Sequence, residues 1–199
     1  MILIIDNFDS FTYLLADLMR KVIPSEQVVV YRNGELSVSE IASMAPRALV
    51  ISPGPYSPEE CDYSCHIIRE FMGRIPILGV CLGHQCLAYV EGLNVKKAPE
   101  PKHGRQSALT INSESSLFPQ NAQGQLVGRY HSLAVERDFS HSEIIATAYA
   151  ADDGVVMALE NRKMNWVGVQ FHPESILTQS GELLVSYCLN FLGLSSHGR

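Results

Sequence analysis

One cysteine of the sequence sits in a setting that favours nucleophilic chemistry. Cys81 lies in G-V-C-L-G, between the apolar run Ile75–Val80 and the helical pattern that follows it. This context predicts a tight strand-to-helix turn, in which Gly79 and Gly83 leave room and the cysteine side chain is exposed. The positive end of the following helix favours the thiolate, so Cys81 is a candidate nucleophile; simple packing of a small apolar side chain is the alternative.

A cysteine nucleophile needs a histidine base, and the local sequence favours His172. His172 follows W-V-G-V-Q-F and precedes Pro173 and Glu174. A proline keeps the residue before it extended, and side chains two apart in an extended segment point the same way. Glu174 would then orient the imidazole and stabilise its cation. His131, in R-Y-H-S-L, is the chief alternative base, although no carboxylate follows it at the same spacing.

A proline-rich turn follows the third expected strand, at the same edge of the sheet as Cys81. In S-P-G-P, Gly54 keeps its backbone N–H, whereas the prolines on either side of it have none. Together with the N–H of Leu82, the residue after the nucleophile, Gly54 is placed to bind the oxygen of a tetrahedral intermediate. A stiff turn without a chemical role is the alternative interpretation.

The first half of the chain alternates short apolar runs with helical patterns, which predicts βαβ units and a parallel sheet. The expected strands are Met1–Ile5, Val28–Tyr31, Ala48–Ile51 and Ile75–Val80. A helix between the first two, capped by Asp9 or Ser10, presents an apolar face of Phe11, Leu14, Leu15, Leu18, Met19 and Val22. Further helices are expected at Ser37–Met44 and Tyr63–Met72.

From about Lys96 the pattern becomes β-rich, and the pairing is expected to be antiparallel or mixed. The expected strands are Ser107–Ile111, Gln125–Tyr130, Ile144–Tyr149, Val155–Glu160 and Val167–Phe171. A last helix begins near Gly181, with a buried stripe of Leu183, Leu184, Tyr187, Cys188, Phe191 and Leu192. The polar segment 112–124 is expected to be a mobile loop. The whole predicts an α/β fold with an open, mostly parallel twisted sheet flanked by helices and an additional antiparallel portion in the second half.

Length and composition predict one domain, residues 1–199, with a large core. The net charge of -6 without a Lys/Arg cluster argues against nucleic acid or an anionic membrane as partner. The first residues do not resemble a signal peptide, and no apolar run has the length of a membrane span. Five cysteines without C-x-x-C spacing argue against disulfides and zinc, so we expect free thiols in a reducing cytoplasm.

Five segments together resemble the class I, triad-type glutamine amidotransferases over essentially the whole chain. They are D-N-F-D-S-F-T-Y, I-S-P-G-P, G-V-C-L-G-H-Q, R-Y-H-S-L and Q-F-H-P-E-S-I. The first and fourth look like the second components of aminodeoxychorismate synthase and anthranilate synthase. The sequence looks slightly closer to the former, which serves p-aminobenzoate and folate synthesis, than to the latter, which serves tryptophan synthesis. A subunit shared by both synthases remains a further alternative.

The resemblance implies a flavodoxin-like fold and a role for each matching residue. It implies a triad of Cys81, His172 and Glu174, with oxyanion donors from Gly54 and Leu82. It also implies a set of glutamine-binding residues: Pro53, Gly54, Pro55, Gln85, Ser132 and Leu133. The sequence departs from the family pattern at Tyr56, Glu91-Gly92-Leu93 and Arg105.

The implied reaction is the hydrolysis of L-glutamine to glutamate and ammonia, with no metal or organic cofactor. The implied protein partner is a chorismate-binding synthase subunit, component I, which would use the ammonia. The alternatives are a stand-alone cysteine hydrolase and an inactive regulatory subunit. The intact Cys81, His172 and Glu174 set argues against the inactive subunit, whereas the fold alone does not decide between the enzymes.

Overall fold

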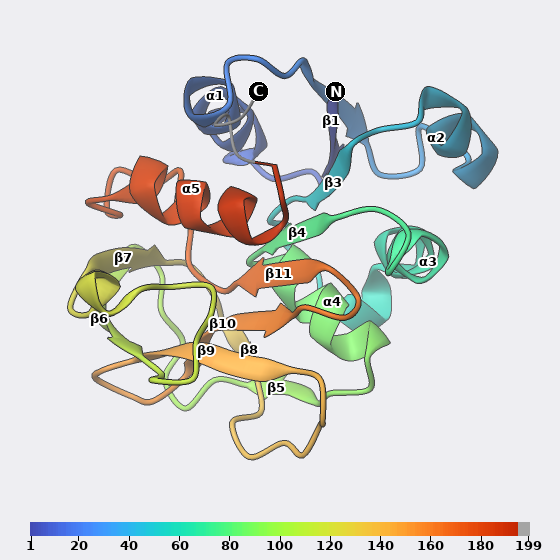
Figure 1. Ribbon diagram of the computed structural model, residues 1–199. Helices are drawn as coiled ribbons and strands as arrows, with labels where there is room; N and C mark the ends of the chain where they lie inside the picture. The colour runs from blue at the N-terminus through green and yellow to red at the C-terminus, as the bar shows by residue number, and fades with distance from the viewer. Residues whose placement is uncertain (195–199) are drawn as a thin grey trace.

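The computed structural model describes residues 1–194, in which nine strands form one sheet with helices on both faces (Figure 1). Across the sheet the order is β2 (Val28–Arg32), β1 (Ile2–Asp6), β3 (Ala48–Ile51), β4 (Ile77–Val80), β11 (Trp166–Val169), β10 (Val156–Asn161), β9 (Ile145–Ala150), β6 (Arg105–Ile111) and β7 (Leu126–Arg129). Neighbours from β2 to β11 are parallel, and those from β11 to β7 are antiparallel. The predicted α/β fold is confirmed, and residues 195–199 of the predicted domain lie outside this description.

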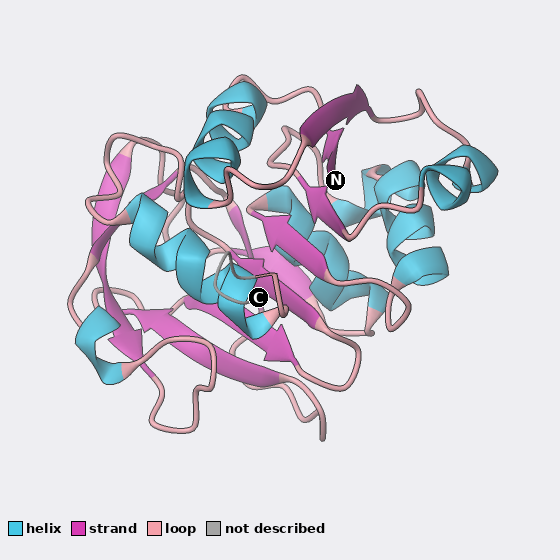
Figure 2. Cartoon of the chain, turned by 45° about the horizontal axis from the view of Figure 1, so that its top comes forward, coloured by secondary structure: helices cyan, strands magenta, loops and turns pink. Residues whose placement is uncertain are grey.

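Helices cover the two faces of the sheet in separate groups, as Figure 2 shows. On one face α1 (Thr12–Val22) packs against α5 (Gly181–Phe191); on the other lie α2 (Val38–Met44), α3 (Asp62–Phe71) and α4 (Leu82–Val90). Alternate side chains of β1 enter the two cores, with Ile2 and Ile4 on one face and Leu3 and Ile5 on the other. Burial on both faces explains why this strand reads as a continuous apolar run.

A small second sheet was not predicted from the sequence. In it β5 (Val95–Lys97) pairs antiparallel with β8 (Leu133–Val135), and Lys97 lies opposite Leu133. The strands are only three residues long and β5 contains two lysines, so neither shows a clear hydrophobic pattern. The pairing fixes the backbone at the end of R-Y-H-S-L.

Leu14, predicted to lie on the apolar face of its helix, and Leu183, predicted to lie in a buried stripe, are both exposed. Leu14 of α1 is 51% exposed and Leu183 of α5 is 43% exposed. The core contacts of these helices are made by a narrower stripe that includes Leu15 and Leu184. The predicted cap of α1 is wrong, because Phe11 occupies the N-cap position and makes no side-chain cap hydrogen bond. The Asp9 carboxylate instead accepts the N–H of Phe11, before the helix, at 2.8 Å.

The segment 112–124 packs against the body of the protein, although its polar composition predicts a loop. Leu117 and Phe118 are buried, and the Glu160 carboxylate accepts the N–H of Leu117 at 2.8 Å. The segment also contains the short helix η2 (Gln120–Ala122). Its mobility stays a prediction.

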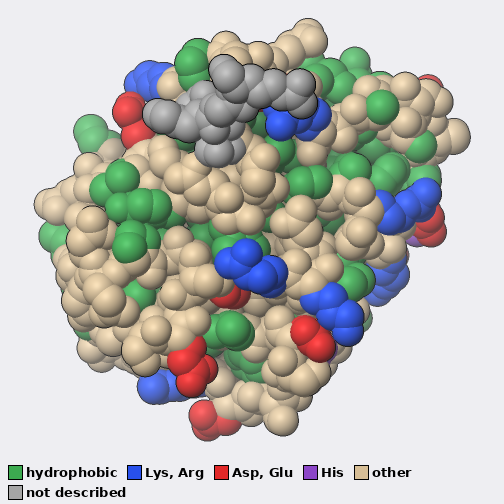
Figure 3. All heavy atoms as spheres, in the orientation of Figure 1, with side chains coloured by type: hydrophobic (Ala, Val, Ile, Leu, Met, Phe, Trp, Pro, Cys, Tyr) green, Lys and Arg blue, Asp and Glu red, His purple; other side chains and the backbone are tan. Residues whose placement is uncertain are grey.

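The distribution of charged side chains on the surface and the lengths of the helices are typical of ordinary amphipathic elements. On the face shown in Figure 3, basic and acidic side chains are interspersed rather than gathered by sign. Within residues 1–194, none of the helices has the length and apolar character that a membrane span requires.

Candidate active site

Cys81 occupies a strained turn between β4 and α4, as the sequence predicts, but its side chain is buried, at 6% exposure, where the sequence predicts an exposed one. Its φ of 52° and ψ of -102° lie outside the regions that a non-glycine residue normally adopts. A Cβ on Gly83 would lie 2.1 Å from the Ile51 carbonyl oxygen, and a Cβ on Gly79 would lie 2.5 Å from that of Gly83. Only glycines therefore allow the close approach that the turn needs. Strain of this kind costs about 1–3 kcal/mol and persists where the surrounding structure enforces it.

The Cys81 sulfur faces a pocket of about 280 Å³. The pocket is lined by Gly54, Pro55, Tyr56, Ser57, Glu60, Cys81, Leu82, Gln85, Tyr130, His131, Ser132 and Leu133. All predicted oxyanion and glutamine-binding residues except Pro53 therefore line one cavity with the cysteine. Pro53 does not line this cavity. Its carbonyl oxygen accepts a hydrogen bond from the Ser52 hydroxyl at 2.7 Å.

His172 and Glu174 meet as their two-residue spacing predicts. His172 Nδ1 lies 2.6 Å from Glu174 Oε1, and both side chains are buried. His172 lies beyond the end of β11 rather than on it, and its N–H donates to the Gly128 carbonyl at 3.0 Å. The Nε2 atom is buried and has no hydrogen-bond partner among the described residues. It is thus available to a substrate or a thiol.

The charges around His172 favour its protonated form. Burial alone would lower the pKa of His172, but the nearby Cys81 thiolate and the Glu174 carboxylate outweigh burial. They hold the pKa of the imidazole well above its usual value. The arrangement therefore favours a protonated imidazole near Cys81, the form in which a histidine can protonate a leaving group.

Two aromatic rings fix the plane of the His172 imidazole. The ring centroids of Phe11 and Tyr130 lie 5.1 Å and 5.0 Å from that of His172, and both contacts are edge-on. The Tyr130 hydroxyl lies 2.9 Å from the Ser175 hydroxyl, which anchors the ring further. These rings belong to D-N-F-D-S-F-T-Y and R-Y-H-S-L, so both segments serve the site through packing that the sequence does not reveal.

The turn that carries Gly54 is held by Asn7 of the first segment. The Asn7 backbone N–H donates to the Ser52 hydroxyl at 2.8 Å, and its side-chain amide donates to the Ser52 carbonyl at 3.0 Å. A Cβ on Gly54 would lie 2.6 Å from Leu82 Cδ2, so the turn and the start of α4 are in close contact. Because Leu82 opens the helix, its N–H has no acceptor within it. Gly54 and Leu82 therefore lie side by side at the pocket of Cys81, where their oxyanion role stays a prediction.

Gln170 contacts the nucleophile and was not identified from the sequence. Its Nε2 lies 3.6 Å from Cys81 Sγ, and the side chain is fully buried. Gln85 connects to it, since Gln85 Nε2 donates to Gln170 Oε1 at 3.0 Å and to the Leu133 carbonyl at 2.9 Å. The signal was a glutamine two residues before His172, within a predicted strand, Val167–Phe171, that otherwise consists of apolar residues and glycine.

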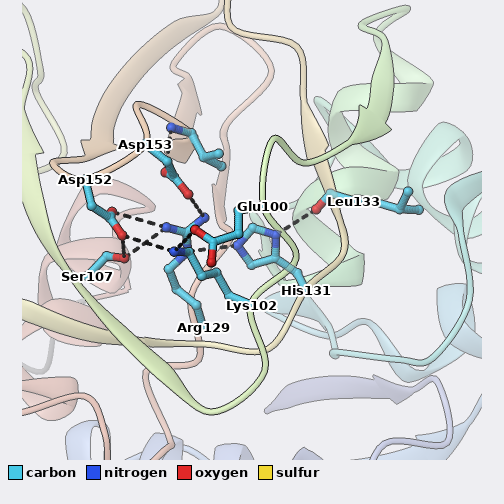
Figure 4. Close-up of polar contacts among 9 residues, drawn as sticks. Glu100, Lys102, Ser107, Arg129, His131, Leu133, Asp152 and Asp153 are labelled. Carbon is cyan, nitrogen blue, oxygen red and sulfur yellow. Dashed lines mark hydrogen bonds and ion pairs between the residues drawn. The ribbon is translucent and has the colours of Figure 1, made fainter.

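His131 borders the same pocket, but both of its ring nitrogens are engaged (Figure 4). Nε2 accepts a hydrogen bond from Arg129 Nε at 3.1 Å, and Nδ1 donates to the Leu133 carbonyl at 2.8 Å. Burial, assisted by the Arg129 guanidinium, lowers the pKa of His131 to about 4. The ring is neutral near pH 7 and has no free lone pair, so the geometry disfavours it as the base.

The described residues contain no group of three or more His, Cys, Asp or Glu side chains arranged to hold a metal ion. All five cysteines are buried free thiols. The pocket with Cys81 and the paired His172 and Glu174 can support acyl transfer through a cysteine, with a histidine to move protons.

A family model agrees with this chemistry. The model for class I glutamine amidotransferases, "Glutamine amidotransferase class-I", matches residues 3–190. In structure, a Thermoplasma acidophilum protein assigned to GMP synthase superposes with a TM-score of 0.81 at 22% identity. That match covers 96% of this chain and 93% of the other, and it supports the fold.

Curated relatives carry two different synthase names. Aminodeoxychorismate synthase component 2 of Escherichia coli K12 is 42% identical over 192 residues, which cover 96% of this chain and 99% of that protein. Anthranilate synthase component 2 of Pseudomonas aeruginosa is 40% identical over 203 residues, which cover 100% of both chains. The match also spans 32% of a longer bifunctional relative from Thermotoga maritima.

Proposed function

The chain belongs to the class I glutamine amidotransferase family, and from this premise we propose that it releases ammonia from glutamine for a chorismate-using synthase. The observation that carries the proposal is the pocket that brings Cys81, Gly54, Leu82 and Gln85 together, beside a paired His172 and Glu174. We propose that residues 1–199 act as a single amidotransferase domain.

In the proposed mechanism the Cys81 thiolate attacks the side-chain amide carbon of glutamine. The N–H groups of Gly54 and Leu82 stabilise the negative oxygen of the tetrahedral intermediate. Protonated His172 gives its proton to the departing nitrogen, so ammonia leaves and a γ-glutamyl thioester remains on Cys81. His172, now neutral and oriented by Glu174, takes a proton from water, which attacks the thioester and releases glutamate.

The pocket offers the groups that glutamine recognition needs. Gln85 Nε2 is already committed to Leu133 and Gln170, so the carbonyl of Gln85 is the group that can accept from the substrate amide. The backbone of Ser132 and Leu133 lies across the cavity and is fixed by the pairing of β8 with β5. We assign these groups, together with Gly54 and Pro55, to glutamine binding; Pro53 contributes through the shape of the turn.

An exposed apolar surface adjoins the site, and we assign it to the synthase partner. A groove of about 1070 Å³ runs between α1, the segment after Glu174 and the start of α5. Ile176 is 96% exposed there, and the groove also contains Leu14 and Leu183. Because Glu174 lines the same groove, a protein bound there would lie next to the triad. The chorismate-binding component I is the occupant that we propose.

The pathway that we favour is the synthesis of 4-amino-4-deoxychorismate, with anthranilate synthesis or a subunit shared by both as the alternative. Relatives of both names lie at nearly the same identity, 42% and 40%. Mixing the chain with each candidate partner, chorismate and glutamine, and identifying the amino product formed from chorismate, tests the choice. Formation of anthranilate alone would overturn it.

Partner control of the glutaminase step is the expected behaviour of such a component. Ammonia released into water at neutral pH becomes ammonium, which is not nucleophilic, so an uncoupled site would waste glutamine. We expect slow hydrolysis by the isolated chain and faster hydrolysis when the partner is bound. Steady-state rates with and without partner, each with and without chorismate, check this; Ile176→Asp should lose the activation and keep the basal rate. Equal rates in all four conditions would favour a stand-alone hydrolase.

A further inference from the structure

The lining of the Cys81 pocket includes a carboxylate that belongs neither to the triad nor to the oxyanion donors. Glu60 ends the short helix η1 (Pro58–Glu60), which follows the turn of Gly54, and it lines the pocket together with Ser57. Of the described residues that line this pocket, no other is an Asp or Glu, and none is a Lys or Arg. A negative charge on Glu60 therefore has no cationic side chain opposite it within the pocket.

The Glu60 carboxylate uses only one of its two oxygens in the fold. Oε2 accepts the N–H of Ser57 at 3.0 Å and its hydroxyl at 2.8 Å, which caps η1. Within residues 1–194 no hydrogen bond or ion pair reaches Oε1. The N–H of Ser57, assisted by its hydroxyl, lowers the pKa of Glu60, so the group is ionised near neutral pH. One charged oxygen thus stays available to a ligand.

Free glutamine carries a group that fits this oxygen. An α-ammonium distinguishes it from a glutamine residue inside a peptide chain. In the proposed reaction the side-chain amide lies at Cys81, so the α-ammonium lies at the other end of the molecule, against the rest of the lining. An ammonium group is a donor only, and its strongest hydrogen bonds are those to carboxylates. The other acceptors of the lining are neutral, which leaves Glu60 as the charged partner.

We propose that Glu60 determines specificity for free glutamine, with Oε1 accepting a hydrogen bond from the α-ammonium of the substrate. This inference rests on the proposed glutaminase function and adds to it a binding group for the end of the substrate that does not react. The α-ammonium is equally charged in the bound substrate and in the transition state, so its contact should lower KM and leave kcat almost unchanged. Capping of η1 alone is the alternative role of this carboxylate.

Glu60→Gln removes the charge and keeps the cap. The amide oxygen of the new side chain can still accept the N–H of Ser57, so the backbone before η1 should be retained. Glu59→Gln is the matched control, because Glu59 is the preceding residue of η1, is exposed and does not line the pocket of Cys81. Thermal unfolding of both variants checks that the fold is intact.

Removing the amino group from the substrate isolates its interaction with Glu60. Glutaramate has the same side-chain amide and a carboxylate but no amino group, and its hydrolysis also releases ammonia. The quantity to measure is kcat/KM for glutamine divided by kcat/KM for glutaramate. This ratio should fall about fivefold in Glu60→Gln, mainly through KM for glutamine, since an exposed ion pair has an effect of that order. In Glu59→Gln the ratio should equal that of the wild type.

Binding of the same two compounds can be measured without hydrolysis. Each should protect Cys81 from alkylation by iodoacetamide, followed by peptide mass mapping. The glutamine concentration that halves the alkylation rate should rise about fivefold in Glu60→Gln, whereas the glutaramate concentration should stay the same. A lost cap would instead weaken protection by both compounds alike.

The two measurements separate failure of this inference from failure of the proposed function. If the wild type hydrolyses glutamine and Glu60→Gln keeps the wild-type ratio of the two substrates, the specificity role is wrong and Glu60 serves only as a cap. If the wild type does not hydrolyse glutamine, the proposed function fails. Protection by glutamine that weakens only in Glu60→Gln would still support Glu60 as the ligand of the ammonium, and absence of protection by either compound would overturn both proposals.

Discussion

His172 and His131 are both buried, at 2% and 5% exposure, and both lie near Cys81, yet their neighbours have opposite charges. A carboxylate and a thiolate surround His172 and raise its pKa, whereas burial and a guanidinium lower the pKa of His131 to about 4. One ring can therefore carry a proton to a leaving group, and the other remains neutral. The charge of the contacting side chain, rather than burial or position, thus decides which histidine can act as the base.

Replacing each histidine in turn should produce the largest difference in glutamine hydrolysis between His172 and His131. His172→Asn removes the proton carrier, so kcat for glutamine hydrolysis should fall by about 10³-fold. His131→Asn keeps a donor for the Leu133 carbonyl and should lose no more than about tenfold. Steady-state kinetics with saturating glutamine check both variants. A greater loss in His131→Asn than in His172→Asn would reverse the assignment of the base.

Glu174→Gln tests whether the carboxylate is what distinguishes His172. The amide keeps the shape of the side chain but removes the negative charge that raises the pKa of the imidazole. We expect kcat to fall about 10²-fold with KM almost unchanged, because the lost interaction belongs to the transition state. Full glutamine saturation curves separate the two constants. A raised KM with an unchanged kcat would instead identify Glu174 as a substrate ligand.

The opposite pKa shifts of His131 and His172 should appear in the pH dependence of the free energy of unfolding. Below about pH 6.5 an unfolded histidine binds a proton, whereas His131, with its pKa of about 4, and His84, with its pKa lowered by burial to about 3, stay neutral in the folded state. The unfolded state therefore binds more protons, and stability falls as the pH drops from 6.5 toward 4, by at most about 1.4 kcal/mol per pH unit for each ring.

His172 has the opposite sign, because its stabilising contribution is complete below pH 6.5 and is lost as the pH rises through its raised folded-state pKa. Urea unfolding between pH 5 and 6.5 measures the loss of stability that His131 and His84 cause as the pH falls. In His131→Asn the slope of the unfolding free energy against pH should be smaller than in the wild type by about 1 kcal/mol per pH unit. An unchanged slope would mean that His131 titrates normally in the folded protein.

The chemistry that depends on neighbours in the sequence was predictable. The glycines around Cys81 indicated the strained turn, and Pro173 between His172 and Glu174 indicated that the two side chains meet. These features are local, because backbone geometry over a few residues determines them. The order of motifs along the strands was enough to bring the local features to one edge of the sheet.

Features that depend on distant residues were not predictable. Arg129 pairs with Asp152 and Asp153 across more than twenty residues, and no local pattern marks that contact. Gln170 reads as an ordinary strand residue until the fold places it against Cys81. Leu14 was placed on one apolar face with Leu15 and Leu18, because an apolar pattern does not distinguish a core face from an exposed apolar groove.

A glutamine-analogue electrophile provides the most direct test that His172, and not His131, activates Cys81. The wild type, His172→Asn and His131→Asn would be treated with the same reagent, and the modified peptides identified by mass mapping. The expected result is a single adduct on Cys81 in the wild type and in His131→Asn, with almost none in His172→Asn. An adduct on Cys61 or Cys86 with Cys81 unmodified, or labelling of Cys81 that depends on His131 alone, would contradict the assignment.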